Sequence, residues 1–230
     1  QRYADGNATR EELLAVEAGS YHTAGTCTFY GTANSNQLLM EMMGLHIPGS
    51  AFVPPSGDLR ERLTEFAVQT ASRHSALGKD FLPFYEVIDA RSLVNGVIGL
   101  MATGGSTNLM IHILAMARSV GYLMTLEDIA ELSQVTPLLA RIYPNGSADI
   151  NQFHAAGGMA FVIRELLSAN LLHADARSVI GEPISAYAQE PSLAQGHLYW
   201  KDAPAESGDE SILRPTDNPF SAQGGLCRLQ

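Results

Sequence analysis

Two long apolar segments joined at a Gly-Gly pair constrain the fold more than any other feature of this chain. Residues 87–105 read VIDARSLVNGVIGLMATGG, and residues 106–122 read STNLMIHILAMARSVGY. Asp89 is a favourable N-cap, and the length of the first segment favours a buried helix that stops at Gly104 and Gly105. The second segment restarts with three capping residues and is apolar on nearly all sides, which predicts a central helix.

Most of the remaining chain also has helical patterns. Residues 7–19 begin with Asn7 or Thr9 as N-cap, and Glu12 completes a capping box with Thr9. We expect further helices over 35–44 (starting at Ser35 or Asn36), 56–78, 125–135 and 159–172, a turn-rich connection over 143–158, and surface loops with short strands from about residue 181. So much helix, with few strand-like runs, indicates one side of an α/β layer structure.

Composition excludes several classes of protein. The chain has 230 residues, 46% of them hydrophobic, and can bury a core. A net charge of −10 argues against nucleic-acid binding, and no apolar run approaches the ~18 residues that span a bilayer. Two cysteines make no disulfide framework, so we expect a cytoplasmic protein. Because the sequence starts at Gln1 without methionine and stops within GGLCRLQ, we expect a piece of a longer chain.

Cys27 lies in an unusually small and polar stretch, GTCTFYGTANSNQ. It could be a structural cysteine, a metal ligand or a nucleophile. A nucleophile needs a base, and His22 is the only nearby candidate. A zinc site or an iron–sulfur cluster needs more ligands than this stretch supplies, although Gly25, Thr26 and Thr28 would leave room for a cluster and offer it hydrogen bonds. Spacing alone leaves these alternatives open.

A second candidate site is ATGGSTN, residues 102–108. Two glycines before Ser-Thr-Asn at a helix start leave free N–H and hydroxyl groups that suit an anion or a hydroxyl group, although the pattern by itself favours a tight helix–helix turn with an ordinary N-cap. No two histidines have the i, i+4 spacing of a zinc-binding helix. His112 is interpreted as a core histidine on its apolar helix, and His154, beside AAGG, has no assigned role.

Five blocks, taken in order, resemble one family. They are GTCTFYGTANSNQ, MGLHIPGSAFVPP, LMATGGSTNLMIHILAMAR, LLARIYPNGSADINQFHAAGG and RELLSANLLHAD, and their order and spacing are similar to those of the dihydroxy-acid dehydratase/6-phosphogluconate dehydratase family. The segments TFYG after Cys27 and YPNGSADIN look like the phosphogluconate branch of that family. NPFSAQGG, near the end of the sequence, also fits the resemblance.

The resemblance implies a fold and a cofactor. Residues 1–180 would be the mostly helical remainder of an N-terminal, cluster-binding, three-layer α/β/α domain. Residues 181–230 would lead toward a C-terminal β-barrel domain that is missing here. Cys27 would be one ligand of a [4Fe–4S] cluster, or of a [2Fe–2S] cluster used with Mg²⁺. The other cluster cysteines would lie upstream, so Cys227 is interpreted as incidental.

The resemblance also implies an activity. The full enzyme would be a hydro-lyase of the Entner–Doudoroff pathway that dehydrates 6-phospho-D-gluconate, a small phosphorylated sugar acid, and it would form a homodimer that binds neither nucleic acid nor membrane. No catalytic residue falls in this chain, because the proposed base is a serine of the barrel domain, and the chain alone would be inactive. Substrate-binding candidates are Gly105, Ser106, Thr107 and Asn108. The alternatives are another sugar-acid or dihydroxy-acid dehydratase, or a non-catalytic binding module that has lost the cluster.

Overall fold

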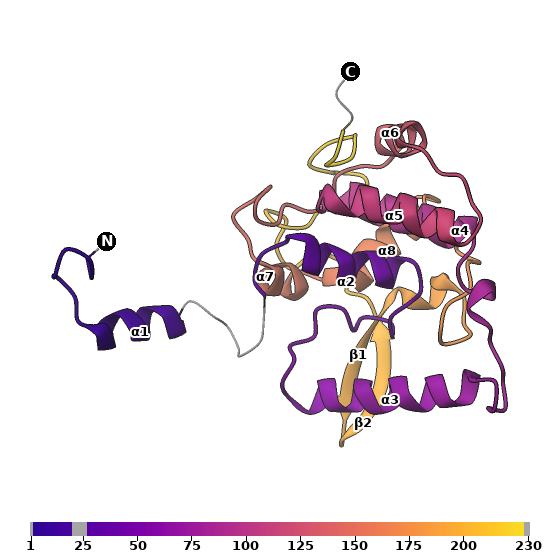
Figure 1. The fold of residues 1–230 in the computed structure, drawn as a ribbon, viewed down its shortest axis with the longest axis horizontal. Helices are drawn as coiled ribbons and strands as arrows, with labels where there is room; N and C mark the ends of the chain where they lie inside the picture. The colour runs from indigo at the N-terminus through magenta and orange to yellow at the C-terminus, as the bar shows by residue number, and fades with distance from the viewer. Residues whose placement is uncertain (1, 20–26, 228–230) are drawn as a thin grey trace.

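The computed structural model describes residues 2–19 and 27–227 (Figure 1). The described chain is mainly helical, with a single hairpin. Its helices are α1 (Arg10–Gly19), α2 (Thr32–Met42), α3 (Asp58–His74), α4 (Ala90–Thr103), α5 (Asn108–Ser119), α6 (Leu126–Val135), α7 (Ile150–Ala155) and α8 (Gly158–Ser168), with 3-10 turns η1 (Phe84–Glu86) and η2 (Ile184–Tyr187). The strands β1 (Gln189–Ala194) and β2 (His197–Asp202) pair antiparallel, with Gln189 opposite Asp202.

Helix α4 is the centre of the fold. From Ser92 to Thr103 every residue except Val94 is buried. Asp89 caps the helix by accepting the Ser92 N–H, and Gly104 ends it in the left-handed conformation at φ 63°. The structure therefore confirms the buried helix predicted within residues 87–105, together with its cap and its stop.

Helix α2 packs along α4 at two glycines of α4. A Cβ added at Gly96 would lie 2.9 Å from side-chain carbons of both Leu39 and Met43, and one added at Gly99 would lie 2.4 Å from Cγ of Met42. Real Cβ atoms do not tolerate such distances, so the two helices approach this closely only because both positions lack a side chain.

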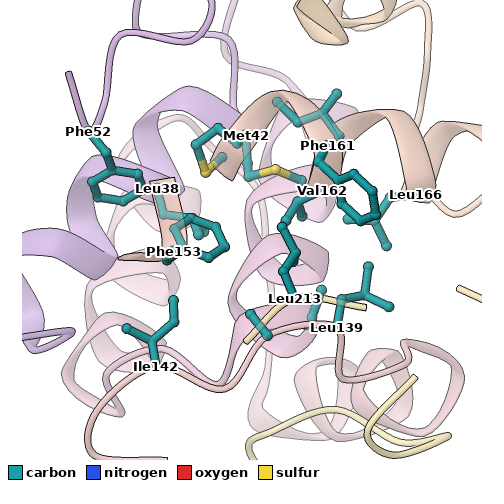
Figure 2. Close-up of a cluster of buried hydrophobic side chains, with 14 of the residues drawn as sticks. Leu38, Met42, Phe52, Leu139, Ile142, Phe153, Phe161, Val162, Leu166 and Leu213 are labelled. Atoms are coloured by element: carbon teal, nitrogen blue, oxygen red, sulfur yellow. The ribbon is translucent and has the colours of Figure 1, made fainter. Parts of the chain in front are cut away.

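Two apolar clusters lie on either side of the α2–α4 pair. Leu39 and Met43 of α2 face the cluster shared with α5 and α6. Figure 2 shows the other cluster, in which residues from α2, α7, α8 and the neighbouring loops gather. The residues labelled there are Leu38, Met42, Phe52, Leu139, Ile142, Phe153, Phe161, Val162, Leu166 and Leu213.

Helix α5 is not the central helix that its apolar sequence predicts. Only Leu109, Ile113 and Ala117 are buried, and Ile111 is 68% exposed. His112 is exposed as well, so its interpretation as a core histidine is wrong. The central position belongs to α4 because its glycines admit a close neighbour, whereas α5 packs through one face alone.

The hairpin packs on α3 in a third, smaller cluster. The ring of Trp200 lies 5.0 Å from that of Phe66, and its indole N–H donates to the Pro48 carbonyl at 3.0 Å. In Figure 1 the hairpin lies beside α3, on the side of the molecule away from α5 and α6. The short strands expected after residue 181 are thus confirmed, and they hold α3 in place.

Helix boundaries agree with the sequence where a cap is local. The boxes Thr9–Glu12 and Thr125–Asp128 both form. Helix α2 instead starts at Thr32, before the predicted Ser35 or Asn36, and Ser35 is buried inside it. The turn-rich connection over 143–158 also contains the short helix α7, which the sequence reading missed.

The described chain is a mixed helical structure with a two-stranded sheet, which is compatible with part of an α/β domain. The three-layer arrangement and a boundary near residue 180 stay predictions. Residues on both sides of that position, such as Phe153 and Tyr187, share the cluster of Figure 2. In the described part of the chain, no helix is long and apolar enough to cross a membrane.

Gly99→Ala tests the close approach of α2 and α4. The added methyl group cannot fit against Met42 without a shift, so we expect a loss of about 1–3 kcal/mol in the free energy of unfolding, measured by urea denaturation. Gly19→Ala is the control, because no described residue would lie within 4 Å of a Cβ at that position. Equal unfolding midpoints for the two variants would contradict this account of the packing.

Candidate functional site

Cys27 begins the second described part of the chain, and its side chain is exposed. Among the described residues its sulfur makes one weak contact, 3.8 Å to the Phe29 carbonyl oxygen. The small residues Gly25 and Thr26, and the candidate base His22, lie outside the described residues. The thiol therefore remains available to a ligand.

The backbone beside Cys27 is held by other parts of the chain. The Asn34 side chain, from the first turn of α2, donates to the carbonyl oxygens of Cys27 (2.9 Å) and Phe29 (2.7 Å). The Ile150 N–H of α7 donates to the Thr28 carbonyl at 3.0 Å. Three successive carbonyl groups are thereby satisfied, and the loop is joined to two helices.

Tyr30 anchors the end of this loop in the core. Its side chain is 2% exposed, and its hydroxyl is 2.7 Å from that of Thr103 at the end of α4. Burial raises the pKa of Tyr30 well above its usual range. The Tyr30 N–H donates to the Tyr143 carbonyl at 3.1 Å, and the Tyr143 ring packs on Phe29. Cys27 is therefore an exposed thiol on an immobilised backbone.

A cavity of about 840 Å³ opens beside Cys27. It lies between the first turns of α2, the loop of residues 45–55, one face of α3 and the start of α7. In the part of the chain that the structure describes, Arg60 is the single charged lining residue, and no carboxylate lines the cavity. The polar lining consists of Cys27, Asn34, Gln37, His46, Ser50, Arg60, Thr64, Thr70 and Asn151.

Arg60 fixes one wall of the cavity. Its Nη2 donates to the Ser50 carbonyl at 2.8 Å and to the Val53 carbonyl, and its Nε lies 3.5 Å from the Pro54 carbonyl. Nη1 has no hydrogen-bond partner among the described residues. The guanidinium group thus binds the loop through Nε and Nη2, and its Nη1 N–H groups remain available as donors.

Glu41 supports the same loop from α2. Its fully buried carboxylate accepts the N–H groups of Gly49 (2.7 Å) and Ala51 (2.9 Å). Burial raises the pKa of Glu41 to about 7, although these hydrogen bonds and the charge of Arg60 act in the opposite direction. The position of the loop therefore depends on one buried carboxyl group.

Two side chains of the cavity carry buried polar atoms without partners. Nδ1 of His46 and Nδ2 of Asn151 are both inaccessible to solvent, and neither has a hydrogen-bond partner in the described structure. Burial, together with the charge of Arg60, lowers the pKa of His46 to about 4, so its ring is neutral at pH 7. An unsatisfied buried polar atom costs about 1–3 kcal/mol.

The predicted substrate-binding residues, Gly105 to Asn108, do not line this cavity. The Ser106 N–H donates to the buried hydroxyl of Ser35 at 2.9 Å. The hydroxyl of Ser106 and the amide of Asn108 both bond to Thr32, at 2.9 and 3.0 Å. The structure thus joins this loop to the start of α2, whereas a role in substrate binding stays a prediction.

The described residues contain no group of three or more His, Cys, Asp or Glu side chains that could hold a metal ion. Cys27 and Cys227 are both free and exposed. The geometry of Cys27 nevertheless fits one ligand of a larger donor set, because its sulfur is accessible, its backbone is fixed and it borders a cavity. Three or four cysteines hold a typical iron–sulfur cluster, so this chain could contribute to such a site but not complete it.

A family model described as "Dihydroxy-acid/6-phosphogluconate dehydratase N-terminal" matches residues 1–187. The chain belongs to this dehydratase family. A phosphogluconate dehydratase of Pseudomonas aeruginosa is 55% identical over 98% of the chain, and one of Rhizobium meliloti is 54% identical over 100%. A dihydroxy-acid dehydratase of Sulfurisphaera tokodaii is 33% identical over 97%. The chain spans 37–38% of the length of these relatives.

The sequence does not predict most of the residues that line the cavity of this dehydratase chain. His46 and Asn151 lie within blocks that carry the family resemblance, yet nothing local marks either as a lining residue. Glu41 offered a usable signal, because a carboxyl group among the leucines and methionines of α2 predicts a buried, paired charge. Arg60 lies on the helix predicted over 56–78, and its local pattern does not reveal that it is partly buried against the cavity loop.

Glu41→Gln tests the buried carboxyl group. The folded chain holds a proton on Glu41 up to about pH 7, whereas the unfolded chain releases it near pH 4.5. Stability from this proton is complete below the unfolded pKa and is lost as the pH rises through about 7, by at most about 3 kcal/mol. We therefore expect Glu41→Gln to gain stability relative to the wild type between pH 5 and pH 7.5.

The measurement is the free energy of unfolding in urea at both pH values. Glu61→Gln, on the exposed face of α3, is the control and should follow the wild type. A constant difference between Glu41→Gln and the wild type across this range would show that the carboxyl group is already ionised at pH 5.

Proposed function

We propose that this chain is part of a 6-phosphogluconate dehydratase, a hydro-lyase that converts 6-phospho-D-gluconate into 2-dehydro-3-deoxy-6-phospho-D-gluconate and water in the Entner–Doudoroff pathway. One observation carries the choice of substrate within the family. Relatives named phosphogluconate dehydratase are 48–55% identical to the chain, whereas a relative named dihydroxy-acid dehydratase is 33% identical over nearly the same span.

Cys27 is proposed as one ligand of a [4Fe–4S] cluster, with a [2Fe–2S] cluster and Mg²⁺ as the alternative. Its exposed sulfur and its position beside the cavity support this role. The family resemblance implies that the other cysteine ligands and a serine base would come from outside this chain. When bound, such a cluster supplies a Lewis acid that favours departure of hydroxide, which is otherwise a poor leaving group.

This chain would contribute by positioning the Cys27 thiolate and the side chains that line the cavity. Asn34 and the Ile150 N–H hold the backbone around Cys27, so the thiolate needs little reorganisation to reach a metal. The dehydration itself removes a proton from C2 and the hydroxyl group from C3, and the resulting enol becomes the 2-keto acid. The residues that line the cavity would hold the rest of the sugar acid during these steps.

The remaining parts of the proposal concern the whole protein. Residues 1–180 would contribute to the cluster-binding α/β domain, and residues 181–230 would connect it to a β-barrel domain. The full enzyme would be a cytoplasmic homodimer. Gly105, Ser106, Thr107 and Asn108 would face substrate or support the start of α2, to which Ser106 and Asn108 are hydrogen-bonded.

Turnover by the full-length enzyme tests the substrate. Purified without oxygen, it should dehydrate 6-phosphogluconate with a higher kcat/KM than gluconate or 2,3-dihydroxy-isovalerate, measured by the appearance of the 2-keto acid. Preference for the dihydroxy acid would replace this proposal with the other branch of the family. Absence of turnover with all three acids would instead favour a binding module.

Cys27→Ser tests the metal ligand in the full-length enzyme. We expect loss of the visible cluster absorbance and of activity with an unchanged circular dichroism spectrum, because the exposed thiol contributes little to the fold. Cys227→Ser is the matched control, since it removes the other exposed cysteine and should retain both signals. Full cluster absorbance in Cys27→Ser would exclude Cys27 as a ligand.

A further inference from the structure

We propose that the cavity beside Cys27 binds the phosphate group of the substrate, and that His46, Asn151 and Nη1 of Arg60 are its recognition groups. This inference rests on the proposed function and extends it, because it assigns one end of the sugar acid to particular side chains. The three residues come from the loop of residues 45–55, from α7 and from α3. They converge on the cavity although the sequence separates them widely.

The charge of the lining favours an anion. The chain carries 24 acidic and 14 basic residues, yet the described lining of this cavity contains one arginine and no carboxylate. Glu41, the buried acid that supports the cavity loop, has a raised pKa and so carries less than a full charge near pH 7. The described lining of this cavity thus combines one arginine with no acidic side chain, although the chain as a whole is negatively charged, and that combination suits an oxyanion.

The unpartnered polar atoms indicate the same ligand. Nδ1 of His46 and Nδ2 of Asn151 are the only buried side-chain polar atoms without partners among the described residues, and both side chains line this cavity. Nδ2 of Asn151 is an obligate donor, and a neutral imidazole can donate from one nitrogen. A phosphate group in the cavity would satisfy both donors once the two side chains rotate toward it.

Arg60 completes the arrangement with a charge. Its Nε and Nη2 are directed to the loop carbonyls, which fixes the plane of the guanidinium group. The Nη1 N–H groups are the remaining donors, and charge-assisted bonds from arginine to phosphate are among the stronger hydrogen bonds in proteins. Burial lowers the pKa of the Arg60 guanidinium from its usual value, which agrees with a partly desolvated charge beside a ligand site.

The position of Cys27 sets the orientation of the substrate. The reacting carbons C2 and C3 have to lie at the metal, and Cys27 lies at the border of the cavity. The phosphate on C6 is the far end of an open chain, so it would lie in the part of the cavity away from Cys27. The carboxylate group next to C2 would then lie on the side of Cys27.

Asn151→Leu and His46→Leu in the full-length enzyme test the proposal. Each variant removes a donor without leaving a buried polar atom unpaired, so neither should lose cluster absorbance or thermal stability. We expect the KM for 6-phosphogluconate to rise about tenfold or more in each variant. Inorganic phosphate and gluconate are then used as competitive inhibitors. The inhibition constant of phosphate should rise together with KM, and that of gluconate should stay constant.

Asn218→Leu and His197→Leu, both at exposed positions, are the matched controls and should keep the wild-type constants. Unchanged KM in both cavity variants would overturn the proposal. An equal rise in the inhibition constant of gluconate would also overturn it, because the cavity would then bind the carboxylate or hydroxyl end. A wild-type enzyme that does not dehydrate 6-phosphogluconate would refute the proposed function itself, before any variant is compared.

Discussion

The packing of α2 on α4 is the constraint on which the rest of the structure depends. Gly96 and Gly99 allow the two helices to approach so closely that side-chain carbons of α2 occupy the space where a Cβ would be. Helix α2 is thereby fixed in position along its length. Because its first turn holds the Cys27 loop and its last turn holds the cavity loop, the position of the candidate site follows from this one helix contact.

Three buried polar residues of α2 fix the positions of three loops. Asn34, Ser35 and Glu41 are each at most 9% exposed, and each is paired with backbone groups of a different loop. Leaving one of them unpaired would cost about 1–3 kcal/mol, so each loop has a strong reason to adopt a single arrangement. These pairings specify where the loops lie, whereas the apolar clusters on either side supply most of the stability.

The sequence predicted the features that depend on neighbouring residues and missed those that depend on distant ones. The caps at Thr9, Asp89 and Thr125 involve contacts three residues apart, and all three form. The early start of α2 at Thr32 depends on hydroxyl and amide groups of residues 106–108, which no local pattern reveals. The apolar composition of residues 108–119 predicts a central helix, but composition does not show how closely a neighbouring helix can approach. The spacing of Gly96 and Gly99 in α4 decides that, and it makes α4 the central helix.

For the candidate site, the sequence likewise predicted the local feature, Cys27, and missed the cavity that distant residues form. Cys27 stood out because a thiol among small polar residues is unusual, and the resemblance gave it a proposed partner. The cavity brings together positions 34, 46, 60 and 151, and their shared surface appears only when the chain is folded. A search for charged or metal-binding spacing could not detect it, since its described lining holds one arginine, no carboxylate and no cluster of metal-binding side chains.

Stability and function oppose each other around this cavity. The fold satisfies the buried polar groups of α2, yet polar atoms of His46 and Asn151 and Nη1 of Arg60 have no hydrogen-bond partner among the residues that the structure describes. Apolar residues at those positions would make a more stable chain by the same physical rule that makes Asn34 and Glu41 effective anchors. Natural proteins tolerate such costs mainly at functional sites, where a ligand satisfies in the complex what the chain leaves unsatisfied. The unsatisfied donors and the exposed thiol on their fixed backbone are therefore best explained together, as two parts of one binding site.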